Sequence, residues 1–462
     1  MKTFFAFILM ASAIFAAVPP ASGEITIDGH IDMRIHMDSV LDAPQESGEV
    51  LEGYTDSHIY TILHLPWGFS FETELLLEGE PCGHDHGHGE EHAHGDDEEE
   101  EPVCRTVVAE EHHEEEGEEE EEDEEAPELR KLSFFGQHYL KLETFTLNYT
   151  RAFGPVKWAL YGGKFVPVAG IDAESLPGVY SYRALHEYDL DPKIGFGTKV
   201  TANAGDYGTH RLNMSVFKAD TTPFSDDGSG DRLKKEDGGP SNNGDFTSVA
   251  FSLGGKNFYT LRDGFFANFL EGFSYHIGYA NQKKQSAIVT EEHLEEGETE
   301  PEIVTVPRGD ETRYTFSIGQ KRNFTENLSL ILKTEYININ DYQGELGRLR
   351  DVWTVAAGFD WKKWRLAGAY SSTNNRSSRF ARGELAEEAE EEMMPPGEDT
   401  GSLGGTIYNF SLTRALGGGA KLGVGYQSVK EEGETTSRIG MLLSYSGSFF
   451  SGSAESHEGH DH

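Results

Sequence analysis

Apolar and polar residues alternate along residues 24–38 with a step of two, which matches the pleat of a β-strand. Only Gly29 interrupts the apolar row, which consists of Ile25, Ile27, Ile31, Met33, Ile35 and Met37. The opposite row is polar and mostly ionisable, with Thr26, Asp28, His30, Asp32, Arg34, His36 and Asp38. A strand with one apolar face and one charged face suits a wall between lipid and water.

The same alternation recurs along most of the chain, between turn residues and acidic stretches. It predicts sixteen strands, at residues 24–38, 53–65, 67–78, 137–151, 156–165, 194–204, 209–219, 245–253, 268–280, 311–321, 327–339, 351–361, 364–372, 404–414, 420–430 and 436–449. Seven short turns fall on one side of these strands and eight long loops fall on the other. We therefore expect an all-β protein, a transmembrane antiparallel β-barrel of about 16 strands with long acidic extracellular loops.

The lipid environment requires such a barrel to close, because an open sheet edge leaves backbone groups unpaired. The last strand, 436–449, should therefore pair with the first. Tryptophan placement agrees with this arrangement, because aromatic residues gather at membrane interfaces. Beside the predicted turns lie Trp67, Trp158, Trp361 and Trp364, and near the opposite end lies Trp353. A large soluble β-sandwich or solenoid also buries one face of each strand, but it does not predict short and long connections in strict alternation.

The chain divides into three parts before any chemistry is considered. Residues 1–23 have the basic start, the apolar run and the small residues of a secretory signal peptide. Residues 24–450 form the barrel, with a His- and Glu-rich loop inserted at 79–131, and residues 451–462 form a His-containing periplasmic tail. The expected location is the bacterial outer membrane, with lipid as the surrounding partner. Because the first strand follows the signal peptide directly, we expect no plug domain.

The charge of the chain excludes one class of partner and favours another. The sequence has 81 acidic and 38 basic residues, for a formal net charge of −43. Such a chain repels nucleic acid and attracts cations. It contains neither the GxSxG pattern of a hydrolase nor the HExxH pattern of a metalloprotease, and we expect no enzyme.

The insert at 79–131 has the most unusual composition. Its histidines are His84, His86, His88, His92, His94, His112 and His113, and acidic residues lie between them. Imidazoles and carboxylates suit Zn, Ni, Cu or Co, so the loop is interpreted as a weak, multi-site trap for a divalent metal or an iron chelate; no cofactor is required. An inert, solvated acidic loop is the alternative. Cys82 and Cys104 flank the first histidines, and in an exported chain a disulfide is favoured over metal ligation by this pair. Further histidines in the tail are His457, His460 and His462.

Sixteen strands enclose an aqueous channel. Its predicted lining is His30, Asp32, Arg34, His36, Glu72, Glu74, Lys141, Glu143, Lys333 and Glu335. The loop at 166–192 is the third on the extracellular side, the position from which a loop often narrows such a pore. Its charged residues are Asp172, Glu174, Arg183, Glu187, Asp189 and Asp191. Folded inward, this loop would favour cations; otherwise these charges only solvate a wide pore.

The segment 161–167, with the sequence YGGKFVP, resembles the strand-end Gly-Lys-aromatic-Val-Pro pattern of the legiobactin-receptor-like siderophore porin family. This resemblance implies a plug-less outer-membrane porin that takes up a small iron chelate or a comparable solute.

Two functions from different classes follow from the sequence. The first is a porin for passive diffusion of small hydrophilic solutes, favouring cations, with metal concentrated at its mouth. The alternative is a surface-anchored metal-sequestering or adhesive protein whose barrel transports nothing. Association of three barrels into a homotrimer stays open.

Overall fold

The computed structural model describes residues 25–42, 50–80, 131–134, 137–186, 188–225, 233–234, 238–258, 271–284, 288–293, 302–377, 404–431 and 434–449. The predicted signal peptide, the seven histidines of the insert, Cys82, Cys104, Glu187 and the tail therefore lie outside the described residues. Within the described residues, no helix has the length and apolar character needed to cross a membrane.

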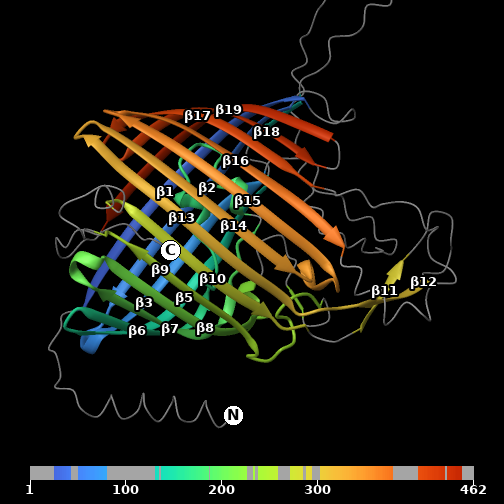
Figure 1. Ribbon diagram of the computed structural model, residues 1–462. Coiled ribbons are helices and arrows are strands. Elements are labelled where there is room, and N and C mark those ends of the chain that lie inside the picture. Colours follow the sequence, from blue (N-terminus) through green and yellow to red (C-terminus); the bar gives the residue numbers. More distant parts are fainter. Residues whose placement is uncertain are drawn as a thin grey trace, which may run out of the picture.

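Among the described residues, sixteen strands close into one antiparallel β-barrel (Figure 1). They are β1 (Thr26–Asp42), β2 (Val50–His64), β3 (Phe69–Glu80), β5 (Gln137–Phe153), β6 (Val156–Phe165), β7 (Lys193–Asn203), β8 (Thr209–Ala219), β9 (Ser248–Lys256), β10 (Phe273–Gln282), β13 (Glu311–Thr325), β14 (Leu328–Asn340), β15 (Arg348–Trp361), β16 (Trp364–Ser377), β17 (Thr406–Gly417), β18 (Ala420–Glu431) and β19 (Glu434–Phe449). Each strand pairs with the next along the chain. The predicted fold class is confirmed.

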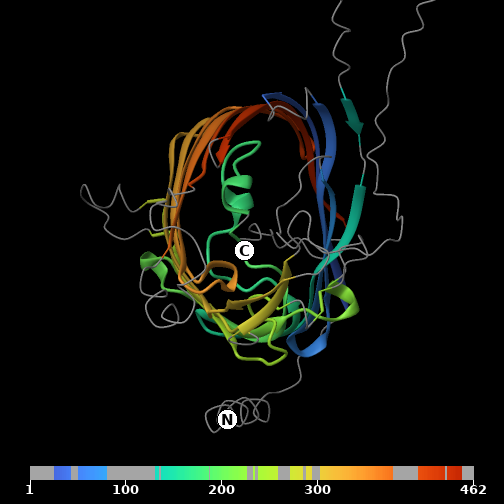
Figure 2. The same ribbon diagram turned by 90° about the vertical axis from the view of Figure 1, so that its right-hand side faces the viewer.

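The first and last strands form the seam that the sequence predicts. β1 pairs with β19 along nearly its whole length, from Gly29 opposite Phe449 to Asp42 opposite Ser437. Figure 2, seen along the barrel, shows the closed ring of strands. Closure pairs the backbone groups of both edges, which hydrocarbon could not satisfy.

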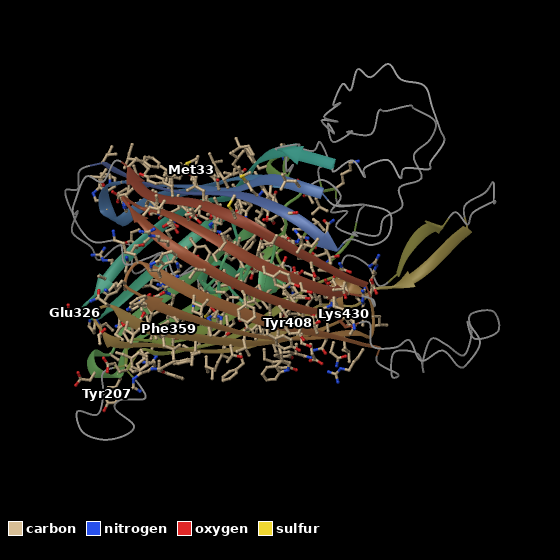
Figure 3. The ribbon with its side chains drawn as sticks, turned by 90° about the horizontal axis from the view of Figure 1, so that it is seen from above. Met33, Tyr207, Glu326, Phe359, Tyr408 and Lys430 are labelled. Carbon is tan, nitrogen blue, oxygen red and sulfur yellow. The ribbon has the colours of Figure 1, made fainter. Side chains whose placement is uncertain are left out.

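Alternation of side chains decides which face meets lipid. On β1, Met33 and Met37 are each 40% exposed, whereas His36 and Asp38 are fully buried. The apolar row therefore faces outward and the ionisable row faces the lumen, as the period of two predicts. Phe359 and Tyr408 lie on the same outer face of the barrel (Figure 3).

Short turns gather at one end of the barrel and longer connections at the other. In Figure 3, Tyr207 and Glu326 lie at the turn end of the barrel and Lys430 lies toward the loop end. At the loop end, β4 (Lys131–Phe134) pairs in parallel with the start of β2, and β11 (Ile288–His293) and β12 (Glu302–Pro307) form a separate hairpin.

Two connections depart from the predicted alternation. β18 and β19 are separated by two residues, and Glu431 pairs with Glu434, so one of the eight loops is short. The connection from β9 to β10 is long and lies at the turn end. The strands predicted at 245–253 and 268–280 also begin three and five residues too early. Asn243 accepts a hydrogen bond from the Asp245 amide, and Thr247 N donates to Asp245 O, so residues 243–247 form a turn instead of a strand.

Residues 166–192, called here the inner loop, leave the rim and run inside the barrel. The loop contains the 3₁₀ turn η2 (Ala173–Ser175) and the short helix α2 (Arg183–His186). Figure 2 shows this green segment within the ring of strands. Tyr180, Ser181 and Ala184 are completely buried between the loop and the inner wall.

Candidate functional site: the inner loop and the charged wall

Apolar side chains attach the inner loop to one side of the lumen. The cluster consists of Ala173, Leu176, Leu185 and Tyr188 from the loop and Ile337, Ile339, Tyr342, Val352, Ala356 and Ala369 from or beside β14–β16. Ile337, Ile339 and Val352 point inward, into what would otherwise be water. Their burial against the loop removes apolar surface from water and drives the loop inward.

Small residues on the inner wall make room for the loop backbone. A Cβ atom at Gly278 of β10 would overlap the carbonyl oxygen of Ala169. At Gly425 of β18 it would lie 2.9 Å from the ring of Tyr180, and at Gly358 of β15 it would lie 2.8 Å from Pro177 Cβ. Glycine at these three positions therefore lets the loop approach the strands closely.

Hydrogen bonds attach the loop at widely separated points of the wall. Ile171 N donates to Glu335 Oε1 at 2.9 Å, and Arg313 Nη1 donates to Tyr188 O at 2.7 Å. Tyr180 OH donates to Asp38 Oδ1 at 2.6 Å, and Tyr54 OH donates to the other oxygen of the same carboxylate. Because the loop is attached to β1, β13 and β14, it crosses the lumen instead of lining one side.

Where η2 approaches β1, β2, β3 and β5, charged residues gather. This loop–wall cluster consists of Asp32, Arg34, Asp56, His58, Glu74, Glu143 and Glu174. Arg34 contacts three carboxylates, Asp32 at 3.1 Å, Asp56 at 3.2 Å and Glu174 at 2.9 Å. The planar fork of donors of the guanidinium suits several carboxylate acceptors at once, and these contacts link the wall to the loop.

His58 lies at the centre of the cluster, with only 9% of its side chain exposed. Its Nε2 lies 3.1 Å from Asp56 Oδ1 and 2.9 Å from Glu174 Oε1. Its Nδ1 lies 3.0 Å from Glu74 Oε1. The ring stacks on Tyr60, with the centroids 5.7 Å apart and the planes 7° apart, which fixes its orientation.

A β-bulge brings Glu143 into this cluster. The pairing of β3 with β5 shifts between Glu74 and Leu75, so that Glu74 lies opposite Thr144 and Leu75 lies opposite Leu142. Glu143 Oε2 lies 3.8 Å from His58 Nδ1, and Thr144 Oγ1 donates to Glu74 Oε2 at 3.2 Å. The bulge thus directs two neighbouring side chains into the lumen, where regular alternation allows one.

The two acidic residues of η2 have pKa values shifted in opposite directions. Burial and the charge of Glu174 raise the pKa of Asp172 to about 6. Burial would raise the pKa of Glu174 too, but the hydrogen bond to His58 and the charge of Arg34 outweigh it and lower the pKa to about 2. Glu174 is therefore charged at neutral pH. Asp172 gains a proton when the pH falls slightly below neutral, near its pKa of about 6.

The structure separates the predicted lumen residues into groups. Asp32, Arg34, Glu74 and Glu143 meet in the loop–wall cluster, while His30 lies at the seam near Ser446 and Ser448. His36 stacks on Tyr54, and its ring also lies near the ring of Tyr180. Across the lumen, Glu335 holds the start of the inner loop. The other predicted members are Glu72 on β3, Lys141 on β5 and Lys333 on β14.

The charged residues of the inner loop are also separated. Glu174 is placed against the wall and Asp172 caps η2 by accepting a hydrogen bond from the Glu174 amide at 2.9 Å. Arg313 donates to the carbonyl of Asp189. Asp191 is largely exposed, and its Oδ2 lies 3.4 Å from Lys193 Nζ. Arg183 is the first residue of α2.

The sequence analysis missed Asp56, His58 and Tyr180. The first two were visible in the alternation of residues 54–60, whose even positions are Tyr54, Asp56, His58 and Tyr60. Reading that row as a lumen face would have placed both beside β1. Tyr180 carried no comparable signal, because its position depends on the path of the inner loop.

Among the solved structures that are similar to this chain, OprB supports the fold. No protein-family model matches the chain, and no curated protein sequence matches it. Solved structures are similar in shape over nearly their whole length. OprB from Pseudomonas putida matches with a TM-score of 0.50 at 8% identity, covering 91% of this chain and 94% of OprB. A loop-deletion mutant of OmpT, an outer membrane protein of Vibrio cholerae, matches with a TM-score of 0.47 at 10% identity, covering 92% of this chain and 100% of the mutant chain. The outer membrane channel DcaP of Acinetobacter baumannii matches with a TM-score of 0.43 at 11% identity, covering 92% and 97%.

The protein thus has the fold of an outer-membrane β-barrel, and sixteen strands are the number typical of porins. No match supports the narrower resemblance to the siderophore porin family, which stays a prediction.

Proposed function

We propose that this protein is an outer-membrane porin through which small hydrophilic solutes diffuse passively, with a preference for cations. The observation that carries the proposal is the inner loop, which crosses the lumen and carries Glu174 onto a charged wall. A loop in this place narrows the lumen, whereas a separate plug domain would fill it. Solutes then pass close to the loop–wall cluster.

The charge of that cluster supports the cation preference. Its five carboxylates, on Asp32, Asp56, Glu74, Glu143 and Glu174, surround one guanidinium and one imidazole. An excess of fixed negative charge in a narrow, partly desolvated passage concentrates cations and repels anions.

Planar bilayers containing the purified protein test this function. We expect stepwise single-channel currents, and a reversal potential in a KCl gradient that shows K⁺ passing more easily than Cl⁻. The Glu174→Gln variant should conduct with a weaker preference for K⁺. A barrel without conductance would contradict the proposal and favour the alternative, a surface anchor for metal capture or adhesion.

The preference for cations should depend on pH in a particular direction. A carboxyl with a pKa of about 6 is charged above that pH and neutral below it, so acidification removes the charge of Asp172 while Glu174 keeps its own. Lowering the pH from about 7.5 to about 5 should therefore weaken the preference for K⁺. Reversal potentials measured at both pH values check this.

The Asp172→Asn variant serves as the control. It should start with the weaker preference and respond less to acidification. Glu174, Lys333 and Arg34 are the charged groups that act on Asp172, and the charge of Glu174 raises its pKa. In Glu174→Gln the midpoint should therefore move below that of the parent protein. An unchanged reversal potential in the parent would contradict the role of Asp172.

Capture of divalent metal by the insert at 79–131, and uptake of metal ions or iron chelates, remain part of the proposal. β3 ends and β5 begins at the loop end of the barrel, so this insert joins the barrel at its mouth. The homotrimer also remains a proposal.

A further inference from the structure

The donor atoms around His58 Nε2 have the arrangement of a divalent-metal site. Asp56 Oδ1 and Glu174 Oε1 lie 3.1 Å and 2.9 Å from this nitrogen. All three donor atoms lie within 4.8 Å of one another. Ligands of a tetrahedral zinc ion, each at about 2.0–2.1 Å, are about 3.3 Å apart, so small side-chain movements suffice to admit the ion.

The other nitrogen of His58 is held as metal-bound histidines usually are. Nδ1 lies 3.0 Å from Glu74 Oε1, and Thr144 Oγ1 holds the second oxygen of Glu74. Nδ1–H donates to Glu74, and Nε2–H donates to Asp56 and Glu174. A metal ion would take the place of the Nε2 proton, so that the Nε2 lone pair and the two carboxylates become its ligands while Glu74 keeps the proton on Nδ1. The ring of Tyr60 lies nearly parallel to the imidazole, with the two planes 7° apart.

Arg34 does not block this site. Arg34 contacts Oδ2 of Asp56, whereas His58 contacts Oδ1, so the two partners use different oxygens of this carboxylate. A metal ion would displace Arg34 only from Glu174 Oε1, and Asp32 and Asp56 would keep it in place. The side chain of Glu174 is 31% exposed, which leaves the fourth position of the metal open to water or solute.

We propose that Asp56, His58 and Glu174 bind a divalent cation of the zinc class inside the lumen, with Glu74 orienting His58. The inference deepens the proposed function and rests on it, because such a site acts on transport only in an open pore. Two ligands come from β2 and the third from the inner loop. The ion would therefore join loop to wall at the constriction.

Binding and conduction are measured separately on the full-length protein. Co²⁺, which takes zinc sites and absorbs visible light, is titrated into the folded barrel in detergent and then displaced by Zn²⁺. The variants are His58→Gln, Glu174→Gln and Glu74→Gln, and migration of unheated protein on gels verifies that each is folded. The control is His64→Gln, because His64 lies on the same strand and contacts one carboxylate, Asp28, at 2.9 Å.

We expect the parent protein and His64→Gln to show the same tetrahedral Co²⁺ spectrum. His58→Gln and Glu174→Gln should lose it, and Glu74→Gln should weaken the apparent affinity by about 10- to 100-fold. An absent spectrum in the parent, or the same spectrum in parent and His58→Gln, would overturn the site. In the second case the metal is held elsewhere in the chain.

Bilayer currents complete the test. Zn²⁺ should reduce the conductance of the parent and of His64→Gln, and it should act at higher concentration on His58→Gln. A parent that binds Co²⁺ through His58 but never conducts would overturn the proposed function and leave the metal site intact. A parent that conducts without any effect of Zn²⁺ and without the Co²⁺ spectrum would overturn the metal site alone.

Discussion

A single methyl group added at Gly278 should push the inner loop away from the wall and raise the conductance of the pore. The new Cβ of Gly278→Ala would overlap Ala169 O, a backbone atom that accepts a hydrogen bond from Thr315. A backbone clash cannot be relieved by a rotamer change, and overpacking of this kind costs about 1–3 kcal/mol. The backbone hydrogen bonds between the barrel strands hold the wall in place, so we expect the inner loop to move instead. Single-channel recordings should show larger and noisier currents, with a weaker preference for K⁺.

Gly254→Ala is the matched control, since Gly254 also faces the lumen. Its added Cβ would lie 3.5 Å from the nearest atom, Tyr275 O, which is ordinary contact. This variant should conduct as the parent does. Equal conductance in Gly278→Ala and the parent would show that the inner loop does not limit the current.

Replacing Arg34 by glutamine should change both stability and selectivity. Arg34 is 15% exposed and holds three carboxylates, so its loss leaves Asp32, Asp56 and Glu174 without their shared cation. Charge-assisted hydrogen bonds of this kind contribute about 1.5–3 kcal/mol, and we expect a loss of about 2 kcal/mol in the free energy of unfolding. One fewer positive charge in the constriction should also strengthen the preference for K⁺. Denaturant unfolding in detergent and reversal potentials measure the two effects.

Two further variants separate charge from geometry. Arg34→Lys keeps the charge but loses the planar fork, so it should lower stability while leaving selectivity near that of the parent. Arg365→Gln removes a two-fold contact with Asp360 at 2.6 Å and 3.0 Å, in which Arg365 is 40% exposed. That exposed pair should contribute less than about 1 kcal/mol. An effect of Arg34→Gln no larger than that of Arg365→Gln would contradict the role given to the cluster.

The site itself followed from the sequence only in part. Alternation predicted that Arg34, Glu74 and Glu143 face the lumen, and all three are in the loop–wall cluster. Their convergence on one histidine was not visible, because Arg34 and Glu174 lie 140 residues apart in the chain. The bulge that directs both Glu143 and Thr144 inward breaks the very alternation on which the prediction depended.

By itself, the sequence determined the barrel, the number of its strands, the seam between β1 and β19 and the row that meets lipid. These features follow from a local pattern with a period of two and from the requirement that every strand edge be paired in a membrane. Only the tertiary structure decided where the inner loop lies. Its position depends on glycines and apolar residues of distant strands, Gly278, Gly425 and Ile337 among them, that become neighbours when the barrel closes. The local pattern alone places the charged row of β1 on the lumen side of the wall. Arg34 becomes part of a constriction only because the closed barrel brings the inner loop against it.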